Sequence, residues 1–403
     1  MKITALETIR IEEFPNICFV QVHTDEGLIG LGETYFGTSS VEAWIHDTAA
    51  SVLLGQSPLT IEKHWRQMVG FVGSRSTGVE NRGRSAIDIA LWDILGQASG
   101  QPIYQLLGGL VRDKIPAYNT CAGYQYTRKR PKDAHLPVDN WGTGKAEGPY
   151  EDLEAFLQRA DELAHSLLEE GYMGMKIWPF DPYAQASGGH MITSSELKRA
   201  LEPFEKIRKA VGDKIEIMVE LHSQWDLRTA KHIAKALEEY NPFWYEDPIR
   251  MDNVQALREF ASSTRVPTAA SETLGTRFAY RDILESQAAG VIIFDPTWTG
   301  GISEGRRIAS FADTYELPVA THDCVGPVSF VVDSHLSMAT PNAFIQEVVR
   351  AFYSSWYSEL VTELPKVEKG FVYPLQAPGL GTKLRPEVFK RSDVTIKTSK
   401  ESD

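Results

Sequence analysis

The sequence predicts an α/β protein whose larger part is a TIM barrel and whose N-terminal part is a smaller α+β unit. Between residues 115 and 348, eight strand-length apolar segments alternate with amphipathic helical segments. Eight such units in about 250 residues match the size of a TIM barrel. The N-terminal part instead has strands in succession followed by helices, which predicts a separate α+β unit.

The N-terminal unit is predicted from five segments. Residues 3–11 and 16–24 read as strands, and the glycines of TDEGLIGLGE (24–33) are typical of a hairpin. Residues 39–53 have helical periodicity, and a stronger helix is expected over 84–100, where a glycine ends it. The unit is therefore expected to hold a small sheet with helices packed on it.

The barrel strands are predicted from apolar runs that end in polar residues. We expect them at 115–120, 172–178, 215–221, 242–246, 267–271, 290–295, 317–322 and 342–348. The polar segment 126–150 is longer than an ordinary loop and predicts either a functional lid or a disordered insertion. The Pro/Gly-rich tail from Val367 onward is expected to return to the N-terminal unit.

Composition narrows the function classes. The chain has 403 residues and a net charge of −13, which argues against a nucleic acid or an anionic membrane as the main partner. Its three cysteines are widely separated, as in reduced cytoplasmic proteins. The sequence shows neither a signal-peptide pattern nor an apolar run of membrane-spanning length. We therefore expect a cytoplasmic enzyme.

Three glutamates stand at the ends of consecutive predicted barrel strands. Glu220, Glu246 and Glu272 are each 26 residues apart, which suits one strand plus one helix. In a parallel barrel they would meet at the C-terminal rim, where barrel enzymes keep their chemistry. Three anionic oxygen ligands favour Mg²⁺ over zinc. A solvated carboxylate at a strand end is the alternative for any one of them.

Three side chains with titratable nitrogens are expected at the same rim. His322 ends the strand 317–322 and is the leading candidate base, because an imidazole can titrate near neutral pH. Lys176, near the end of strand 172–178, is a candidate donor to the substrate carboxylate. His222 follows Glu220 by two, so strand alternation predicts that both face the site. A packed structural histidine or a surface lysine is the alternative in each case.

An ordered set of motifs resembles a known family. The glutamate triad, WYEDPI (244–249), GLGE (30–33), RSAIDIALWDILG (84–96) and the Gly300–Gly301 pair resemble the mandelate racemase branch of the enolase superfamily. The resemblance implies a capping domain at 1–112, a modified (β/α)7β barrel at 113–365, and a tail at 366–403 that completes the cap. It also implies one Mg²⁺ and removal of the proton α to a substrate carboxylate.

Within that branch, the resemblance is greatest to sugar-acid dehydratases of the D-galactonate dehydratase type. It implies that Asp295 pairs with His322, that His222 is the general acid for the leaving 3-hydroxyl, and that Glu347 is a further catalytic residue. Glu220 departs from the family pattern, which has aspartate at the first ligand position. The expected product is a 2-keto-3-deoxy sugar acid.

A second departure bears on the reaction. Racemases of the branch have Lys-x-Lys at the second strand, whereas this chain has Lys176 followed by Trp178 in the second position. Tryptophan cannot accept a proton, so racemisation by two opposed bases is disfavoured. A racemase, epimerase or cycloisomerase that uses the same intermediate, with His322 alone as base, remains the alternative.

Substrate recognition is expected from the capping loops and the barrel rim. The candidates are aromatic or cationic side chains near these loops: Tyr35, Arg75, Arg82, Trp178 and Trp298. Arginine as a solvated surface charge is the alternative for both Arg75 and Arg82. The predicted partner is a small sugar acid, with neither nucleic acid nor membrane involved, and the resemblance implies a homo-oligomer. Which sugar acid and which stereoisomer are used stays open at this level.

Overall fold

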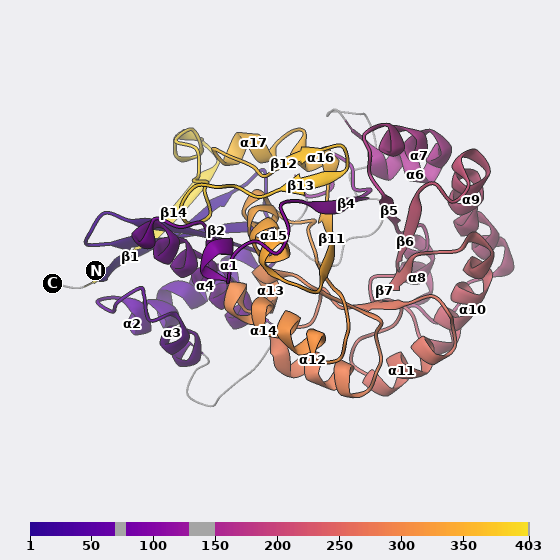
Figure 1. Cartoon of the computed structure of the whole chain (residues 1–403), viewed down its shortest axis with the longest axis horizontal. Coiled ribbons are helices and arrows are strands. Elements are labelled where there is room, and N and C mark those ends of the chain that lie inside the picture. Colours follow the sequence, from indigo (N-terminus) through magenta and orange to yellow (C-terminus); the bar gives the residue numbers. More distant parts are fainter. Residues whose placement is uncertain (69–77, 129–149, 402–403) are drawn as a thin grey trace.

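A computed structural model describes residues 1–68, 78–128 and 150–401 of the chain. Figure 1 shows two parts side by side, a small sheet with its helices and a barrel surrounded by helices. The N-terminus lies at the small sheet, on the side away from the barrel (Figure 1). Within the described residues, no helix is long and apolar enough to cross a membrane.

The small sheet is antiparallel and takes its fourth strand from the C-terminus. Its order is β14-β1-β2-β3. The strands are β1 (Ile3–Ile11), β2 (Ile17–Thr24), β3 (Ile29–Tyr35) and β14 (Val394–Lys400). The predicted N-terminal strands and hairpin are thus present, and the yellow β14 lies beside the indigo β1 (Figure 1).

The longest helix of the small unit, α4 (Val79–Ser99), packs closely on this sheet through glycines of β3. The other helices of the unit are α1 (Thr38–Trp44), the π-helical turn η1 (Ile45–Ala49), α2 (Ala50–Leu53), α3 (Ile61–Gln67) and α5 (Ile103–Leu106). The segment predicted as one helix, 39–53, is therefore interrupted by a π-helical turn. A Cβ on Gly30 or Gly32 would lie 2.0 or 1.9 Å from a carbonyl oxygen of α4, so the GLGE motif lets helix and sheet approach closely.

Eight parallel strands close into a barrel, as the sequence predicts. Strand β11 pairs with β4 and completes the circle. The strands are β4 (Ile115–Thr120), β5 (Gly174–Ile177), β6 (Glu216–Glu220), β7 (Trp244–Glu246), β8 (Thr268–Ala270), β9 (Val291–Phe294), β10 (Val319–Thr321) and β11 (Ala343–Val348). Each lies inside a segment predicted as a strand.

Helices surround the barrel between successive strands, and two short helices follow β11, so the fold is the modified (β/α)7β type. They are α6 (Asp152–Gln158), α7 (Ala160–Glu169), α8 (Asp181–Ser187), α9 (Ser194–Val211), α10 (Leu227–Leu237), η3 (Glu238–Tyr240), α11 (Val254–Ser262), α12 (Thr276–Glu285), α13 (Pro296–Thr299), α14 (Gly301–Asp313), α15 (Pro327–Ala339), α16 (Arg350–Tyr353) and α17 (Tyr357–Leu360). α9 begins with a capping box in which Thr193 and Glu196 bond each other's backbone N–H groups.

The barrel interior changes character along its axis. Away from the strand ends it is filled by apolar side chains: Tyr118, Met218, Trp244, Ala269, Val291, Ile293, Ala320 and Ile345. Trp244 and Glu246 are two residues apart on β7, and the indole Nε1 donates to Glu246 Oε2 over 2.9 Å. The apolar layer therefore ends where the carboxylates begin.

The C-terminal tail serves both parts of the molecule. Strands β12 (Lys366–Glu368) and β13 (Phe371–Tyr373) form a hairpin that pairs antiparallel with the start of β4. After the 3-10 turn η4 (Val388–Lys390), β14 joins the small sheet as expected. The division at 1–112, 113–365 and 366–403 remains our proposal. Most of the long polar segment predicted at 126–150 lies outside the described residues.

Candidate active site

The three glutamates meet at the carboxyl ends of neighbouring strands. Glu220 and Glu246 are the last residues of β6 and β7 and pair in register, while Glu272 follows β8 by two residues. One oxygen from each lies within 4.8 Å of the others; Glu220 and Glu246 are fully buried, and Glu272 is 9% exposed. Glu220 Oε2 accepts no hydrogen bond from the described residues. An all-oxygen, anionic and partly unsatisfied donor set of this kind fits a hard divalent cation.

Lys176 lies among these carboxylates. Its Nζ is 2.8 Å from Glu246 Oε1, 2.8 Å from Glu347 Oε1 and 3.7 Å from Glu220 Oε2. Burial alone would lower the pKa of Lys176, but the surrounding carboxylates outweigh it and raise the pKa well above its ordinary value. The ammonium group is therefore charged at every physiological pH and offsets part of the negative charge of the rim.

Glu347 is fixed by donors on several sides. The Thr120 hydroxyl donates to its Oε1, and the Asp323 backbone N–H donates to its Oε2 over 3.0 Å. Lys176 is the third donor, so both carboxylate oxygens of Glu347 are fixed near the C-terminal end of β11. The structure thus brings together two candidate catalytic residues that the sequence placed 171 positions apart.

His322 is held between two carboxylates. Its Nδ1 is 2.9 Å from Asp295 Oδ2, and its Nε2 is 2.9 Å from Glu272 Oε2. Asp295 is itself fixed, because its Oδ1 accepts from the Thr297 backbone N–H over 2.7 Å and from the Thr297 hydroxyl over 2.6 Å. The Asp295–His322 pair has the geometry of a histidine oriented by a carboxylate.

Electrostatics favour a proton on His322. Burial lowers the pKa of its imidazole, but Glu272, Glu347 and the bond to Asp295 raise it well above the ordinary value. Burial would likewise raise the pKa of Glu272, yet the neighbouring imidazolium lowers it to about 2. A divalent cation held by Glu272 would offset the charge of this carboxylate and lower the pKa of His322, which would leave Nε2 able to accept a proton.

His222 reaches the same pocket by a route that strand alternation did not foresee. Strand β6 ends at Glu220, and His222 has a left-handed backbone with φ of 49°. Its backbone N–H donates to Glu220 Oε1 over 2.6 Å, and its ring Nδ1 is 2.7 Å from Asp181 Oδ2. Burial lowers the pKa of His222, but Asp181, Glu220 and Glu272 raise it to about 10. His222 therefore lies at the pocket as predicted, but the predicted reason, alternation along a strand, was wrong because β6 ends at Glu220.

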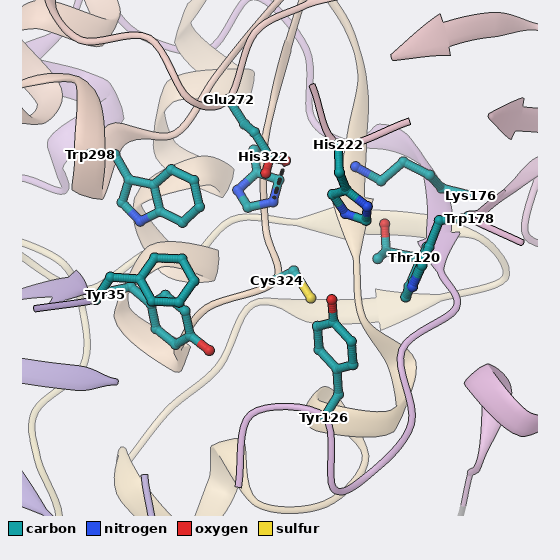
Figure 2. A pocket seen from close by; sticks show the side chains of 11 residues that line it. Tyr35, Thr120, Tyr126, Lys176, Trp178, His222, Glu272, Trp298, His322 and Cys324 are labelled. Atoms are coloured by element: carbon teal, nitrogen blue, oxygen red, sulfur yellow. Dashed lines mark ion pairs between the residues drawn. The ribbon is translucent and has the colours of Figure 1, made fainter. Parts of the chain in front are cut away.

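Lys176, His222, Glu272 and His322 line one pocket, and Figure 2 shows their side chains converging on it. The lining residues are Tyr35, Phe36, Thr120, Tyr126, Lys176, Trp178, His222, Glu272, Trp298, His322 and Cys324. Tyr35 and Trp298 form an aromatic wall on one side, and Trp178 lies on the other (Figure 2). The capping hairpin, through β3, thus closes a pocket whose ionisable groups come from the barrel.

The chain matches two family descriptions that together span most of its length. Residues 4–108 match the mandelate racemase / muconate lactonizing enzyme N-terminal domain, and residues 158–388 match the enolase C-terminal domain-like family. The chain belongs to the mandelate racemase branch of the enolase superfamily. The resemblance inferred from the motifs is confirmed, and so is the barrel with its capping sheet.

Individual relatives cover nearly the whole chain. A D-galactonate dehydratase from Pectobacterium atrosepticum is 30% identical over 97% of this chain and 94% of its own length. A crystal structure of an enolase of the mandelate racemase subgroup from Agrobacterium tumefaciens is 48% identical, covers 99% of both chains and has a TM-score of 0.87. An enolase protein from Sargasso Sea environmental sequencing is 39% identical with a TM-score of 0.87 over the full length of both chains. These relatives establish an enzyme of the superfamily and support the predicted hydro-lyase class.

The predicted recognition residues differ in where they lie relative to the pocket. Arg82 lies outside the pocket lining, with its guanidinium 4.6 Å from the centre of the Trp298 ring, and it donates to the Tyr35 backbone carbonyl over 2.6 Å. It therefore braces the aromatic wall instead of facing the pocket. Trp298 lies 5.1 Å from His322 between ring centres. Arg75 lies outside the described residues.

Several residues in or beside the pocket were not found from the sequence. Asp181, which holds His222, follows β5 in the segment WPFDPYA, where its only signal was an Asp-Pro helix start. Thr120 and Tyr126 line the pocket from the end of β4 and the segment after it. Only the rule that strand-end residues face the rim could have indicated Thr120, and nothing in the sequence pattern singled out Tyr126.

Proposed function

We propose that this protein is a Mg²⁺-dependent acid-sugar dehydratase that converts a sugar acid into a 2-keto-3-deoxy sugar acid. The observation that carries the proposal is a pair of histidines, each bonded to an aspartate through Nδ1, in one pocket beside the glutamate triad. Dehydration needs a base for the α-proton and an acid for the leaving hydroxyl, and these two imidazoles supply one group for each task.

His322 is the proposed base. Asp295 on Nδ1 leaves Nε2 as the nitrogen directed into the pocket, toward Glu272. Nε2 would take the proton α to the substrate carboxylate, and Asp295 would stabilise the imidazolium that forms. A divalent cation bound by Glu220, Glu246 and Glu272 would stabilise the negative charge that develops on the substrate carboxylate.

Lys176 and Glu347 are proposed to organise the same end of the substrate. Lys176 is a buried cation at the carboxylate end of the site, so it would attract the substrate carboxylate and hold it beside the glutamates. Glu347 in turn fixes Lys176 through the 2.8 Å ion pair. Lys176 keeps its proton in this role.

His222 is the proposed acid, and Trp178 supports dehydration over racemisation. Nε2 of His222 would give its proton to the oxygen leaving C3, so that water departs. Trp178 lies 5.8 Å from the His222 ring, edge to face, and its indole cannot act as the second base of a racemase. The similarity to a relative named D-galactonate dehydratase supports a sugar acid as the substrate.

The remaining assignments stay proposals. We propose Mg²⁺ as the ion because every donor is a carboxylate oxygen, a small sugar acid as the partner, and the cytoplasm as the location. A homo-oligomer stays a prediction of the family resemblance. Light scattering coupled to size-exclusion chromatography would measure the oligomeric state.

A screen of sugar acids tests the proposal. Purified protein with Mg²⁺ is incubated with aldonic, uronic and aldaric acids, and keto acid is detected with semicarbazide. We expect a signal for at least one acid, and its loss in His322→Asn. Silence across the library, with α-hydrogen exchange detected in D₂O, would instead indicate the racemase, epimerase or cycloisomerase alternative.

A further inference from the structure

His222 has a buried carboxylate partner of its own. Asp181 opens α8, is 3% exposed, and places Oδ2 2.7 Å from His222 Nδ1. Its other oxygen, Oδ1, is also buried and accepts no hydrogen bond from the described part of the chain. Within the described residues, the hydrogen bond to His222 therefore accounts for the burial of this carboxylate, since a buried charge without a partner is costly.

The contact decides which ring nitrogen of His222 is available. An ionised carboxylate can only accept hydrogen bonds, so Nδ1 must carry a hydrogen. Nε2 is then the nitrogen left for the pocket. The ring is further restrained by the edge of Trp178 and by the backbone N–H bond to Glu220 Oε1 of 2.6 Å.

The same device occurs twice on the barrel. Asp295 follows β9 and holds His322, which follows the neighbouring strand β10, whereas Asp181 and His222 follow the neighbouring strands β5 and β6. Strands β5 and β9 are four places apart in the closed circle of eight. The two histidine–aspartate pairs therefore lie on opposite sides of the barrel axis and use the same nitrogen, Nδ1, toward their carboxylates.

We propose that Asp181 is the positioning residue for the acid half of the reaction. It keeps a hydrogen on Nδ1 of His222 and directs Nε2–H at the leaving group. In that step the Nε2 proton moves to the C3 hydroxyl oxygen as the C3–O bond breaks and water leaves. The electron pair left at C2 by proton abstraction forms the C2–C3 double bond. The other ring hydrogen stays on Nδ1 of His222, in its hydrogen bond to Asp181. This inference rests on the proposed dehydratase function.

Asp181→Asn separates the two halves of the reaction. The amide has the shape of the carboxylate but is neutral and can donate to Nδ1, so the variant ring would keep Nε2–H without the Nδ1–H that the transfer to the leaving group requires. In the Mg²⁺-loaded enzyme we expect the dehydration kcat to fall about 10- to 100-fold with KM changed less than about threefold. In D₂O the total rate of α-hydrogen loss, exchange plus dehydration, should stay within about threefold of wild type because His322 is untouched. An equal fall of both rates, or no fall in dehydration, would overturn the proposal.

A matched variant controls for loss of a histidine–aspartate pair as such. Asp226 Oδ2 is 3.0 Å from Nδ1 of His190, whose side chain is 62% exposed and outside the pocket lining. Asp226 also caps α10, a role that asparagine fills equally well. Asp226→Asn should leave both rates unchanged.

A substrate-free measurement keeps this proposal separate from the proposed function. In ¹⁵N-histidine-labelled protein, with the His222 signals assigned by their loss in His222→Gln, Nδ1 should be protonated in the wild type. Asp181→Asn should shift the ring toward the tautomer with a bare Nδ1. A wild-type ring with bare Nδ1 would overturn the role of Asp181 whatever the reaction, whereas a wild type that yields no keto acid would sink the dehydratase assignment alone.

Discussion

Two buried environments in this protein treat a histidine in opposite ways. In α15, His335 is fully buried, stacks on Tyr104 with ring centres 5.7 Å apart, and has Nε2 3.1 Å from the Leu380 carbonyl. Burial lowers the pKa of His335 to about 4. At the barrel rim, His322 is 4% exposed, yet its pKa is raised well above the ordinary value because Glu272, Glu347 and Asp295 outweigh burial.

The difference shows that burial alone lowers the pKa of a histidine in this protein, whereas neighbouring carboxylates can raise it. Both rings are removed from water, so the cost of desolvating a charged imidazole applies to both. Only the rim collects acidic side chains, since eight parallel strands end there and each can place a side chain at the same level. The fold thus turns a regular spacing in the sequence into a local concentration of charge.

The largest expected effect comes from removing one rim carboxylate. Glu246→Gln keeps the side-chain shape but removes an anionic ligand and the 2.8 Å ion pair of Lys176. Loss of Lewis-acid stabilisation worth several kcal/mol should lower kcat/KM by about 10³-fold or more, and Mg²⁺ binding measured by titration calorimetry should weaken.

The matched control lies on the surface of the same barrel. Glu238→Gln removes a carboxylate that is 39% exposed and pairs with Lys235. Both Mg²⁺ affinity and activity should be unchanged. Wild-type Mg²⁺ affinity in Glu246→Gln would contradict the role of the triad and remove the basis of the comparison.

The next effect tests the other side of the comparison, at His335. Its folded pKa of about 4 lies below the unfolded value, so the unfolded state binds the proton more tightly. The stability due to a neutral His335 is therefore complete above about pH 6.5 and is lost as the pH falls toward 4. Between pH 7.5 and 5 this should lower the free energy of unfolding by about 2 kcal/mol.

His335→Gln isolates that contribution, because glutamine does not titrate and its amide can still donate to the Leu380 carbonyl. Urea titrations of wild type and variant at the two pH values give the difference in pH dependence. Parallel pH dependence in both proteins would show that burial in α15 does not depress the pKa of this ring, and the contrast with the rim would fail.

The smallest expected effect concerns the edge of the rim. Arg82→Lys keeps the charge but loses the planar stack on Trp298 and the bond to the Tyr35 carbonyl. A cation–π contact worth about 1 kcal/mol predicts a rise in KM of about fivefold with kcat little changed. Arg281→Lys, at an exposed arginine of α12 paired with Asp282, is the control and should behave as wild type. A fall in kcat without a change in KM would contradict a bracing role.

Much of this architecture could be predicted because barrel strands are apolar runs of regular length with polar residues near their C-terminal ends. Apolar runs of strand length located all eight barrel strands, and polar residues at or near the ends of several runs lie at the rim. Glu220, Glu246 and His322 were found in this way. His222 was predicted to face the site because of strand alternation, but β6 ends at Glu220. The chain then takes a left-handed conformation at His222, which a strand pattern does not predict.

The rest depended on contacts between segments far apart in the sequence. Asp181 meets His222 across 41 residues, and Arg82 meets Trp298 across 216, so neither contact follows from a local period. Arg82 was predicted to bind substrate because a cation near a capping loop suggests it, but packing turned its guanidinium onto an aromatic face. The π-helical turn inside 45–49 has no sequence signal that we recognise.

The division of labour between the two pocket histidines is the central claim, and one NMR experiment in D₂O tests it most directly. The substrate found by the screen is incubated with wild type, His222→Asn and His322→Asn, and deuterium at C2 and keto-acid formation are followed together. We predict that His222→Asn exchanges the α-hydrogen without releasing water and that His322→Asn does neither. Dehydration by His222→Asn at the wild-type rate, or exchange by His322→Asn, would contradict the account.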